Sequence, residues 1–283
     1  MKFIDALNDS EKPKASVIVI SYNNSAHIKH CLDRILNQDV TFSCELVLCD
    51  DYSSDDTTKI INNMIPDLRN VRKHFSSENL YTQSKLWSER MFNTLSELKG
   101  DVFFFVDGDD YWSEDSSRIQ KMAKTLLTDL SLSMCFSDTL LTDEINPISS
   151  KFILPESLRK TIPVDQLRLL GYSNINLGAA CFRNVNIQWP EEYLLQFNSD
   201  TWWPFLWSDF GPAKYQADCG FLTYRVHSEG AWSATLKEKK QRNKLIFACQ
   251  LISHMLKTDN LEGAKLNIRR LLPLMIDNPY IRK

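Results

Sequence analysis

The sequence predicts an α/β protein built on an open, mostly parallel sheet. Three apolar runs, at residues 15–20, 45–49 and 102–106, each end in a polar loop that precedes a helical pattern. Strand, polar loop and helix, repeated three times within about a hundred residues, is the pattern of such a sheet. Ligands of these sheets bind beyond the carboxyl ends of the strands, so we expect the three loops to line one crevice.

The first two units differ in the residues that follow their strands. The run at 15–20 is followed by four polar or aromatic residues: Ser21, Tyr22, Asn23 and Asn24. Residues 26–36 then carry apolar side chains at helical spacing, which predicts a helix. The run at 45–49 ends instead in two acidic residues, Asp50 and Asp51.

The third loop holds three carboxylates within four residues: Asp107, Asp109 and Asp110, with Gly108 between the first two. Like charges this close are costly unless a cation neutralises them. Asp107 and Asp109 can reach the same side of the chain, and the glycine lets a ligand approach the backbone. Mg²⁺ or Mn²⁺ bridged by a phosphate is the natural occupant. The alternative is an acidic turn that caps a helix beginning near Ser116.

Together, the segments at 16–24, 45–57 and 104–112 resemble those of family 2 glycosyltransferases of the GT-A fold in order, interval and strand context. The resemblance is close over residues 14–120 and looser over 130–235. It implies a Rossmann-like, mostly parallel central sheet with helices on both faces. It also implies a nucleotide-sugar donor, first of all a UDP-sugar, a divalent metal (Mn²⁺ or Mg²⁺) and inversion at the anomeric carbon.

The resemblance assigns roles to residues of the three loops. Tyr22 corresponds to the aromatic residue against the nucleobase, Asp51 to the carboxylate that hydrogen-bonds the base, and Asp107 to the acid near ribose and metal. Asp109 corresponds to the direct metal ligand, while Asp110 would support it or cap a helix. The neighbouring loop residues Ser21, Asn23 and Gly108 complete the expected donor site.

A basic residue facing the nucleotide is expected on the helix predicted at residues 79–98, and Lys85 is the candidate. Here the sequence departs from the family, because Tyr81 replaces a common glycine and the common arginine-asparagine pair is missing. An ordinary exposed lysine is the equal alternative.

Inverting transfer needs a base for the acceptor hydroxyl. In the family this carboxylate opens a helix in the second half of the domain, a position that Asp200 matches, with Trp202 and Trp203 beside it as expected acceptor contacts. Ser199 replaces the acidic residue that often precedes the base. Asp209 is the rival carboxylate, and an N-cap is the alternative role for Asp200.

A late strand predicted at residues 220–226 ends in His227, and Gly230 follows. By the resemblance, His227 completes the metal shell and Gly230 is the hinge of a loop that closes over the donor. A polar surface histidine is the alternative.

Bulk properties set the cellular context. Seven cysteines without a C-x-x-C spacing favour reduced thiols. The first fourteen residues do not form a secretory signal, and no apolar run approaches the length of about 20 residues that a membrane-spanning helix needs. We therefore expect a cytoplasmic protein, with peripheral association at the inner face of the membrane as an extension of that expectation.

Positive charge is concentrated at the C-terminal end of the chain. Residues 236–283 hold eleven Lys/Arg and four Asp/Glu, a balance of +7 against −10 for the residues before them. Helical spacing predicts two helices, at about 236–256 and 261–276. This pair could lie on an anionic membrane that carries a lipid-linked glycan acceptor, or pack on the catalytic domain or on a second subunit of a homo-oligomer. Nucleic-acid binding is disfavoured because the basic residues lack interleaved aromatics.

The predicted organisation is a GT-A catalytic domain at 1–235, with a nucleotide-sugar half at 1–120 and an acceptor half at 121–235, followed by a basic helical hairpin at 236–283. The predicted function is metal-dependent glycosyl transfer, in bacterial surface polysaccharide synthesis of the O-antigen or capsule type. The alternative is a non-catalytic GT-A module that binds a nucleotide or Ca²⁺. A receiver-like phosphoacceptor domain is disfavoured. Such a domain would be much shorter than this chain and would show a lysine at the end of a late strand, which this sequence does not.

Overall fold

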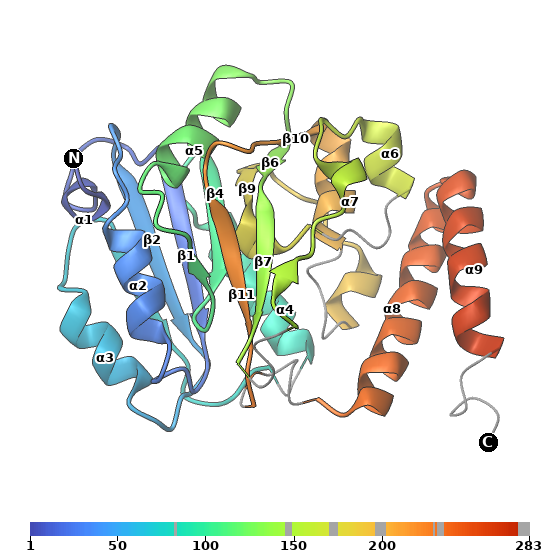
Figure 1. The fold of residues 1–283 in the computed structure, drawn as a ribbon, viewed down its shortest axis with the longest axis horizontal. Coiled ribbons are helices and arrows are strands. Elements are labelled where there is room, and N and C mark those ends of the chain that lie inside the picture. Colours follow the sequence, from blue (N-terminus) through green and yellow to red (C-terminus); the bar gives the residue numbers. More distant parts are fainter. Residues whose placement is uncertain are drawn as a thin grey trace.

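A computed structural model of the chain describes residues 1–81, 84–144, 149–169, 175–195, 202–228, 230 and 235–276. Of these, the side chains of residues 84–87, 194, 195, 273, 274 and 276 are outside the description. A seven-stranded sheet forms the centre of the molecule (Figure 1). Its order is β10-β6-β9-β4-β1-β2-β3.

The central sheet is mostly parallel, as predicted. Only β9 runs antiparallel to its neighbours β4 and β6, whereas β4, β1, β2 and β3 are parallel to one another. The strands are β1 (Ala15–Ser21), β2 (Cys44–Asp50), β3 (Val71–Phe75), β4 (Val102–Asp107), β6 (Met134–Phe136), β9 (Ala180–Arg183) and β10 (Ala213–Tyr215).

A second, four-stranded sheet lies beside the first, with the order β5-β11-β7-β8. Its strands are β5 (Tyr111–Trp112), β7 (Asp138–Asp143), β8 (Lys151–Phe152) and β11 (Phe221–Val226). Because β11 pairs antiparallel with β5, the segment after β11 is brought to the loop that follows β4.

Helices cover both faces of the central sheet. On one face, α2, α3 and α5 pack on the side chains of Val17, Leu46 and Phe104. On the other, α4 and α7 belong to the buried cluster that contains Ile18, Val47 and Phe103, because successive strand residues point to opposite faces. The α-helices are α1 (Phe3–Ala6), α2 (Ile28–Leu36), α3 (Thr57–Met64), α4 (Ser84–Ser96), α5 (Arg118–Thr128), α6 (Val164–Leu169), α7 (Trp203–Trp207), α8 (Lys237–Lys257) and α9 (Leu261–Ile276).

Short 3₁₀ helices occur at Glu156–Leu158, Leu177–Ala179, Glu191–Leu195 and Ser208–Phe210. The predicted strands and helices agree with the observed ones to within a few residues, except that the helix expected at 79–98 begins at Ser84. Among the described helices, none is long and apolar enough to cross a bilayer.

The two C-terminal helices form a hairpin at one side of the molecule (Figure 1). The inner face of α8 packs on the rest of the chain through buried Phe247 and Leu251, and the ring of Phe247 lies 6.2 Å from that of Trp202. The predicted helices are therefore confirmed, and one face of the pair packs internally.

Candidate functional site

The carboxyl ends of β4, β1 and β2 lie side by side. In the register of these strands Ser21 is opposite Asp50, and Ile20 is opposite Asp107. The three polar loops predicted from the sequence thus meet at one edge of the sheet, which is where ligands of parallel α/β sheets bind.

The loops after β1 and β2 are joined by hydrogen bonds. Buried Ser21 donates from Oγ to Asp50 Oδ2 at 2.7 Å, and Asp50 also accepts from the backbone and hydroxyl of Ser53 at 2.9 and 2.6 Å. Asn23, in the left-handed region at φ 51°, accepts from the Ser54 backbone at 2.8 Å. Ser21, Asn23 and Asp50 therefore fix the shape of the crevice wall.

Asp51 is only 2% exposed. Its carboxylate accepts from the backbone N–H groups of Leu80 and Tyr81, at 2.8 and 2.9 Å. The carboxylate expected to recognise a nucleobase thus also secures the loop that leads to α4. Lys85, expected nearby on α4, has a side chain outside the described residues.

Two tyrosines of these loops are exposed, Tyr22 after β1 and Tyr52 directly after Asp51. Tyr22 is 45% exposed, as a stacking residue requires, and Tyr52 is 55% exposed. Tyr52 has φ 67°, a left-handed conformation that is unusual for a bulky residue. Tyr52 was not among the predicted site residues, although its position directly after Asp51 is the signal that could have identified it.

Gly108 packs tightly against the first unit. Its backbone N–H donates to the carbonyl of Ile20 at 2.7 Å. A Cβ at this position would lie 3.0 Å from that same carbonyl, from Asn24 Oδ1 and from Ile28 Cδ1. A glycine thus avoids three tight contacts with the first unit, in addition to allowing any approach by a ligand.

Asp109 and His227 meet although 118 positions separate them. His227 Nε2 lies 3.1 Å from Asp109 Oδ2, and the two side chains are 6% and 23% exposed. The pairing of β11 with β5 produces this contact. The structure therefore brings together the two residues that the sequence suggested as metal ligands.

Asp110 fastens β11 to the acidic loop. Its carboxylate, 1% exposed, accepts from the backbone N–H of Arg225 at 2.9 Å through Oδ1. Its Oδ2 is buried without a partner among the described residues. Burial, together with the carboxylates of Asp109 and Asp107, raises the pKa of Asp110 well above its usual range. Ser117, not Asp110, precedes α5, so the helix-capping role is excluded.

Arg225 contacts several side chains near the pair of Asp109 and His227. Its guanidinium lies 2.9 Å from His27 Nδ1 and 2.7 Å from His30 Nδ1, and 4.5 Å from the centroid of the Tyr111 ring. The rings of His27 and His227 are 4.6 Å apart. Burial and the Arg225 charge lower the pKa of His27 and of His30.

This histidine and arginine cluster was not selected from the sequence. The only signal was the position of Arg225 in the run that ends at His227. The pairing of His27 and His30 with Arg225 depends on the packing of α2 against β5, the strand that pairs with β11, which spacing along the chain does not reveal.

The side chains here provide some of the ligands that a divalent cation needs. Carboxylate and imidazole groups suit Mn²⁺ or Mg²⁺, and Asp109 and His227 supply one of each at 3.1 Å. Within the described residues, no three or more His, Cys, Asp or Glu side chains form a complete ligand set.

The expected acceptor contacts of Trp202 and Trp203 require correction. Their rings are 0% and 1% exposed. The indole of Trp203 donates to the hydroxyl of Tyr193 at 2.8 Å, and its ring stacks on that of Trp207 at 5.2 Å. Both tryptophans are core residues, because their rings pack within a buried aromatic cluster on one face of the central sheet.

The structure describes only one of the two candidate bases, Asp209. Asp200 lies outside the described residues. Asp209 is bound to Arg168 at 2.8 Å on the surface, an ion pair typical of a solvated position. Gly230, the proposed hinge, donates from its backbone to the carbonyl of His227 at 3.3 Å.

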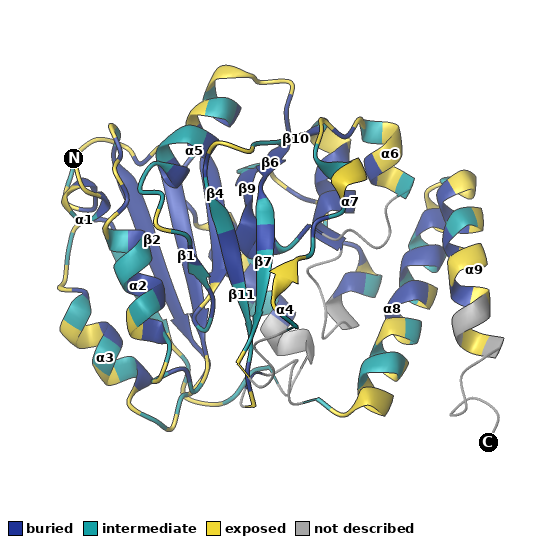
Figure 2. Ribbon diagram, viewed as in Figure 1, coloured by how far each residue is buried: buried dark blue, intermediate teal, exposed yellow. Residues whose placement is uncertain are grey.

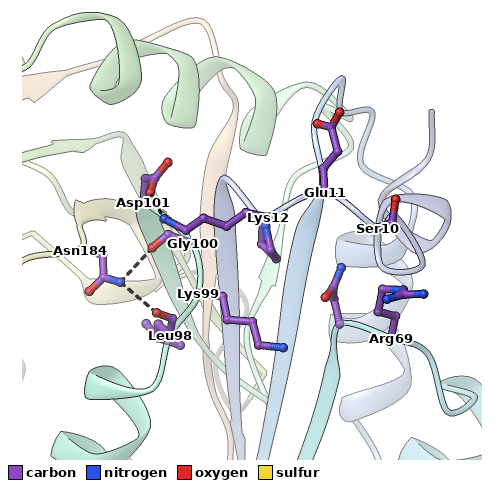
Figure 3. Close-up of a pocket in the computed structure, with 11 residues that line it drawn as sticks. Ser10, Glu11, Lys12, Arg69, Leu98, Lys99, Gly100, Asp101 and Asn184 are labelled. Carbon is purple, nitrogen blue, oxygen red and sulfur yellow. Dashed lines mark hydrogen bonds and ion pairs between the residues drawn. The ribbon is translucent and has the colours of Figure 1, made fainter.

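A cavity of about 530 Å³ lies elsewhere, beside the amino ends of β1 and β4 (Figure 3). Lys12 and Lys99 are among its lining residues, and Asp101 there binds Lys12 at 2.7 Å. Because the acidic loops are at the carboxyl ends of the same strands, this cavity is separate from the candidate site.

Comparison with known proteins agrees with this arrangement. Residues 16–146 match the model of glycosyl transferase family 2. The chain is thus similar to this family over just under half of its length. The match includes Asp51 and Asp109, whereas His227 lies beyond it.

Two relatives show how far the sequence resembles those of other proteins. An uncharacterised protein of Mycobacterium tuberculosis is 27% identical over 80% of this chain, which spans 62% of that protein. The GalNAc(5)-diNAcBac-PP-undecaprenol beta-1,3-glucosyltransferase of Campylobacter jejuni is 34% identical over 35% of this chain and 30% of its own length. The chain thus spans less than two thirds of these relatives.

Solved structures resemble this chain over most of its length. Staphylococcus aureus TarS (residues 1–349) in complex with UDP-GlcNAc has a TM-score of 0.59 and 19% identity, over 84% of this chain and 66% of that one. The mannosyltransferase PcManGT of Pyrobaculum calidifontis, with GDP-Man and Mn²⁺, has a TM-score of 0.55 and 16% identity, over 96% and 72%. The GT-A fold expected from the sequence is confirmed.

Proposed function

We propose that this protein is an inverting, metal-dependent glycosyltransferase that moves a sugar from a nucleotide-sugar donor to an acceptor hydroxyl. The contact of 3.1 Å between Asp109 and His227 supports this most directly. It joins two distant segments at the edge of the sheet where ligands of α/β proteins bind. There the pair offers a carboxylate and an imidazole to the divalent metal that such a transfer uses.

The proposed donor is a UDP-sugar held across the three loops. The exposed ring of Tyr22 offers a stacking face for the base, and Asp51 can accept a further hydrogen bond from a base N–H beside those from Leu80 and Tyr81. TarS and PcManGT bind UDP-GlcNAc and GDP-Man in their structures, which supports a nucleotide sugar here. Lys85 is proposed as a basic contact to the nucleotide.

Asp109 and His227 are the proposed holders of Mn²⁺ or Mg²⁺, with Asp107 beside them. Such a cation, when bound, neutralises the charge of the leaving diphosphate. The Mn²⁺ in the PcManGT structure supports a divalent metal. Asp110 and Arg225 would keep His227 at its place opposite Asp109.

The proposed acceptor is a lipid-linked glycan intermediate of bacterial surface polysaccharide synthesis. The similarity to the Campylobacter enzyme named for a PP-undecaprenol substrate supports this class. Asp200, three residues before α7 in the sequence, is the proposed base that removes the proton of the acceptor hydroxyl.

Replacing Asp200 by Asn tests the proposal. Asn keeps the shape but cannot accept the proton, so turnover should fall by about 10² to 10⁴, while donor affinity stays within a few fold. Asp209→Asn is the matched control, since that carboxylate is paired with Arg168 on the surface. NMR of the product should show an inverted anomeric configuration, because a single displacement forms no covalent intermediate. Retention, or an Asp200→Asn variant as active as the parent, would contradict the mechanism.

A further inference from the structure

The helical hairpin of α8 and α9 exposes an unusual share of apolar side chains. Fourteen large apolar residues are exposed in the described part of the chain, and seven of these lie between residues 236 and 276. They are Leu236, Ile246, Leu256, Leu261, Ile268, Leu272 and Met275. Concentrated exposure of this kind marks an interaction surface.

These side chains are not the ones that hold the hairpin to the molecule. The inner face uses other residues, such as Phe247 and Leu251 on α8 and Ala264 and Leu271 on α9, all of them buried. On α9, which stands at the outer edge of the molecule, exposed positions recur along the helix (Figure 2). The apolar residues that are exposed therefore form a second face.

On α9 this second face is a continuous stripe. Leu261, Ile268, Leu272 and Met275 follow one another at steps of seven, four and three, which places them on one side of a helix. They are 52%, 39%, 48% and 39% exposed. Lys265, also exposed, is one turn from Leu261, and exposed Arg269 is one turn from Lys265, so cationic groups border the stripe.

The outer side of α8 has a similar composition. Lys239, Arg242, Ile246, Cys249 and Leu256 recur at steps of three, four, three and seven, and all are exposed. The basic residues occupy the first half of this row and the apolar ones the second. Both helices thus combine apolar and cationic groups on surfaces that face solvent.

The distribution of charge along the chain indicates which kind of partner binds the outer face of the hairpin. Residues 236–283 carry a balance of +7 and the remainder −10. A second copy docking through the same face would bring like charges together, whereas an anionic lipid surface attracts the basic side chains and accepts the apolar ones. We propose that the outer face of the α8–α9 hairpin binds anionic phospholipid membranes. This extends the proposed function, by placing the domain where a lipid-linked acceptor resides, but the binding itself does not require transfer activity.

Sedimentation of the full chain with vesicles tests the proposal. The parent should bind phosphatidylglycerol vesicles at low salt, bind less at 0.5 M salt, where the Debye length is only about 4 Å, and bind pure phosphatidylcholine weakly. Each basic residue at an anionic surface contributes roughly a fivefold increase in binding. The double variant Lys265→Glu, Arg269→Glu should therefore bind at least about 25-fold more weakly, and Leu272→Glu should also lose binding.

Two variants outside the hairpin are the matched controls. Leu130→Glu alters a side chain that is 75% exposed after α5, and Lys124→Glu reverses an exposed charge on α5. Both should bind vesicles as the parent does. All of these changes are at exposed positions, so every variant should unfold at the temperature of the parent.

Three results would overturn the proposal. One is a parent that ignores phosphatidylglycerol at low salt, and another is equal loss in the hairpin variants and the controls. The third is a dimer in light scattering that Leu272→Glu converts to a monomer, which would make a second copy the occupant. Nucleoside diphosphate binding by the same samples separates these outcomes from a failure of the proposed transferase function.

Discussion

At the scale of single residues, Asp110 sets the position of His227. The only described hydrogen bond of its carboxylate is with the backbone of Arg225, two residues before His227, at 2.9 Å. Arg225 in turn contacts His27, whose ring lies 4.6 Å from that of His227. We interpret Asp110 and Arg225 as positioning residues for the contact between Asp109 and His227.

Replacing Asp110 tests this interpretation. Asp110→Ala leaves the Arg225 N–H buried without its acceptor, a loss of about 1 to 3 kcal/mol, and should weaken Mn²⁺-dependent nucleotide binding by about tenfold. Asp110→Asn retains an oxygen acceptor and should restore most of the affinity. Calorimetry of both variants with and without Mn²⁺ measures the difference. Equal affinities for the Ala and Asn variants would show that the bond to Arg225 has no such role.

At the scale of elements, Glu45 links the strands that carry the site. Its carboxylate is fully buried at the start of β2. It accepts from Ser16 on β1 at 2.6 Å, from Arg72 on β3 at 3.0 Å and from the backbone of Lys99, before β4, at 2.9 Å. A buried carboxylate with every oxygen partnered holds the register of four neighbouring strands.

The loss of this carboxylate should therefore destabilise the sheet. Glu45→Ala removes one partner of a buried ion pair and should lower the free energy of unfolding by about 3 to 5 kcal/mol. Glu97 is the matched control, because it binds the same Arg72 at 3.0 Å but is 57% exposed, and Glu97→Ala should cost less than about 1 kcal/mol. Urea titration compares the two. Similar losses in both variants would rule out a special contribution from Glu45.

Element prediction from the sequence succeeded where local patterns govern structure. The apolar runs at β1, β2 and β4 and the helical spacing of α8 and α9 correspond to the observed elements. Trp202 and Trp203 were wrongly expected to contact the acceptor, because they follow closely after Asp200 in the sequence. Their ring partners Phe103, Phe182 and Phe247 come from three other elements of the fold, which no local pattern predicts.

At the scale of the whole molecule, the site depends on two sheets meeting. The central sheet presents Asp51, Asp107 and Asp109 at one edge, and the smaller sheet delivers His227 through the pairing of β11 with β5. The sequence could predict the residues at the strand ends and suggest His227. It could not predict the cluster of His27, His30 and Arg225, since that cluster exists only once both sheets are packed.

The most direct measurement of the central claim is calorimetric titration of a nucleoside diphosphate, UDP first, into the parent protein and into Asp109→Ala and His227→Ala, each in Mn²⁺ and in EDTA. The parent should bind much more tightly in Mn²⁺ than in EDTA, and both variants should lose that difference, because the carboxylate and the imidazole are the proposed ligands. Equal affinity of the parent in Mn²⁺ and EDTA, or full metal dependence in both variants, would contradict the assignment of this site.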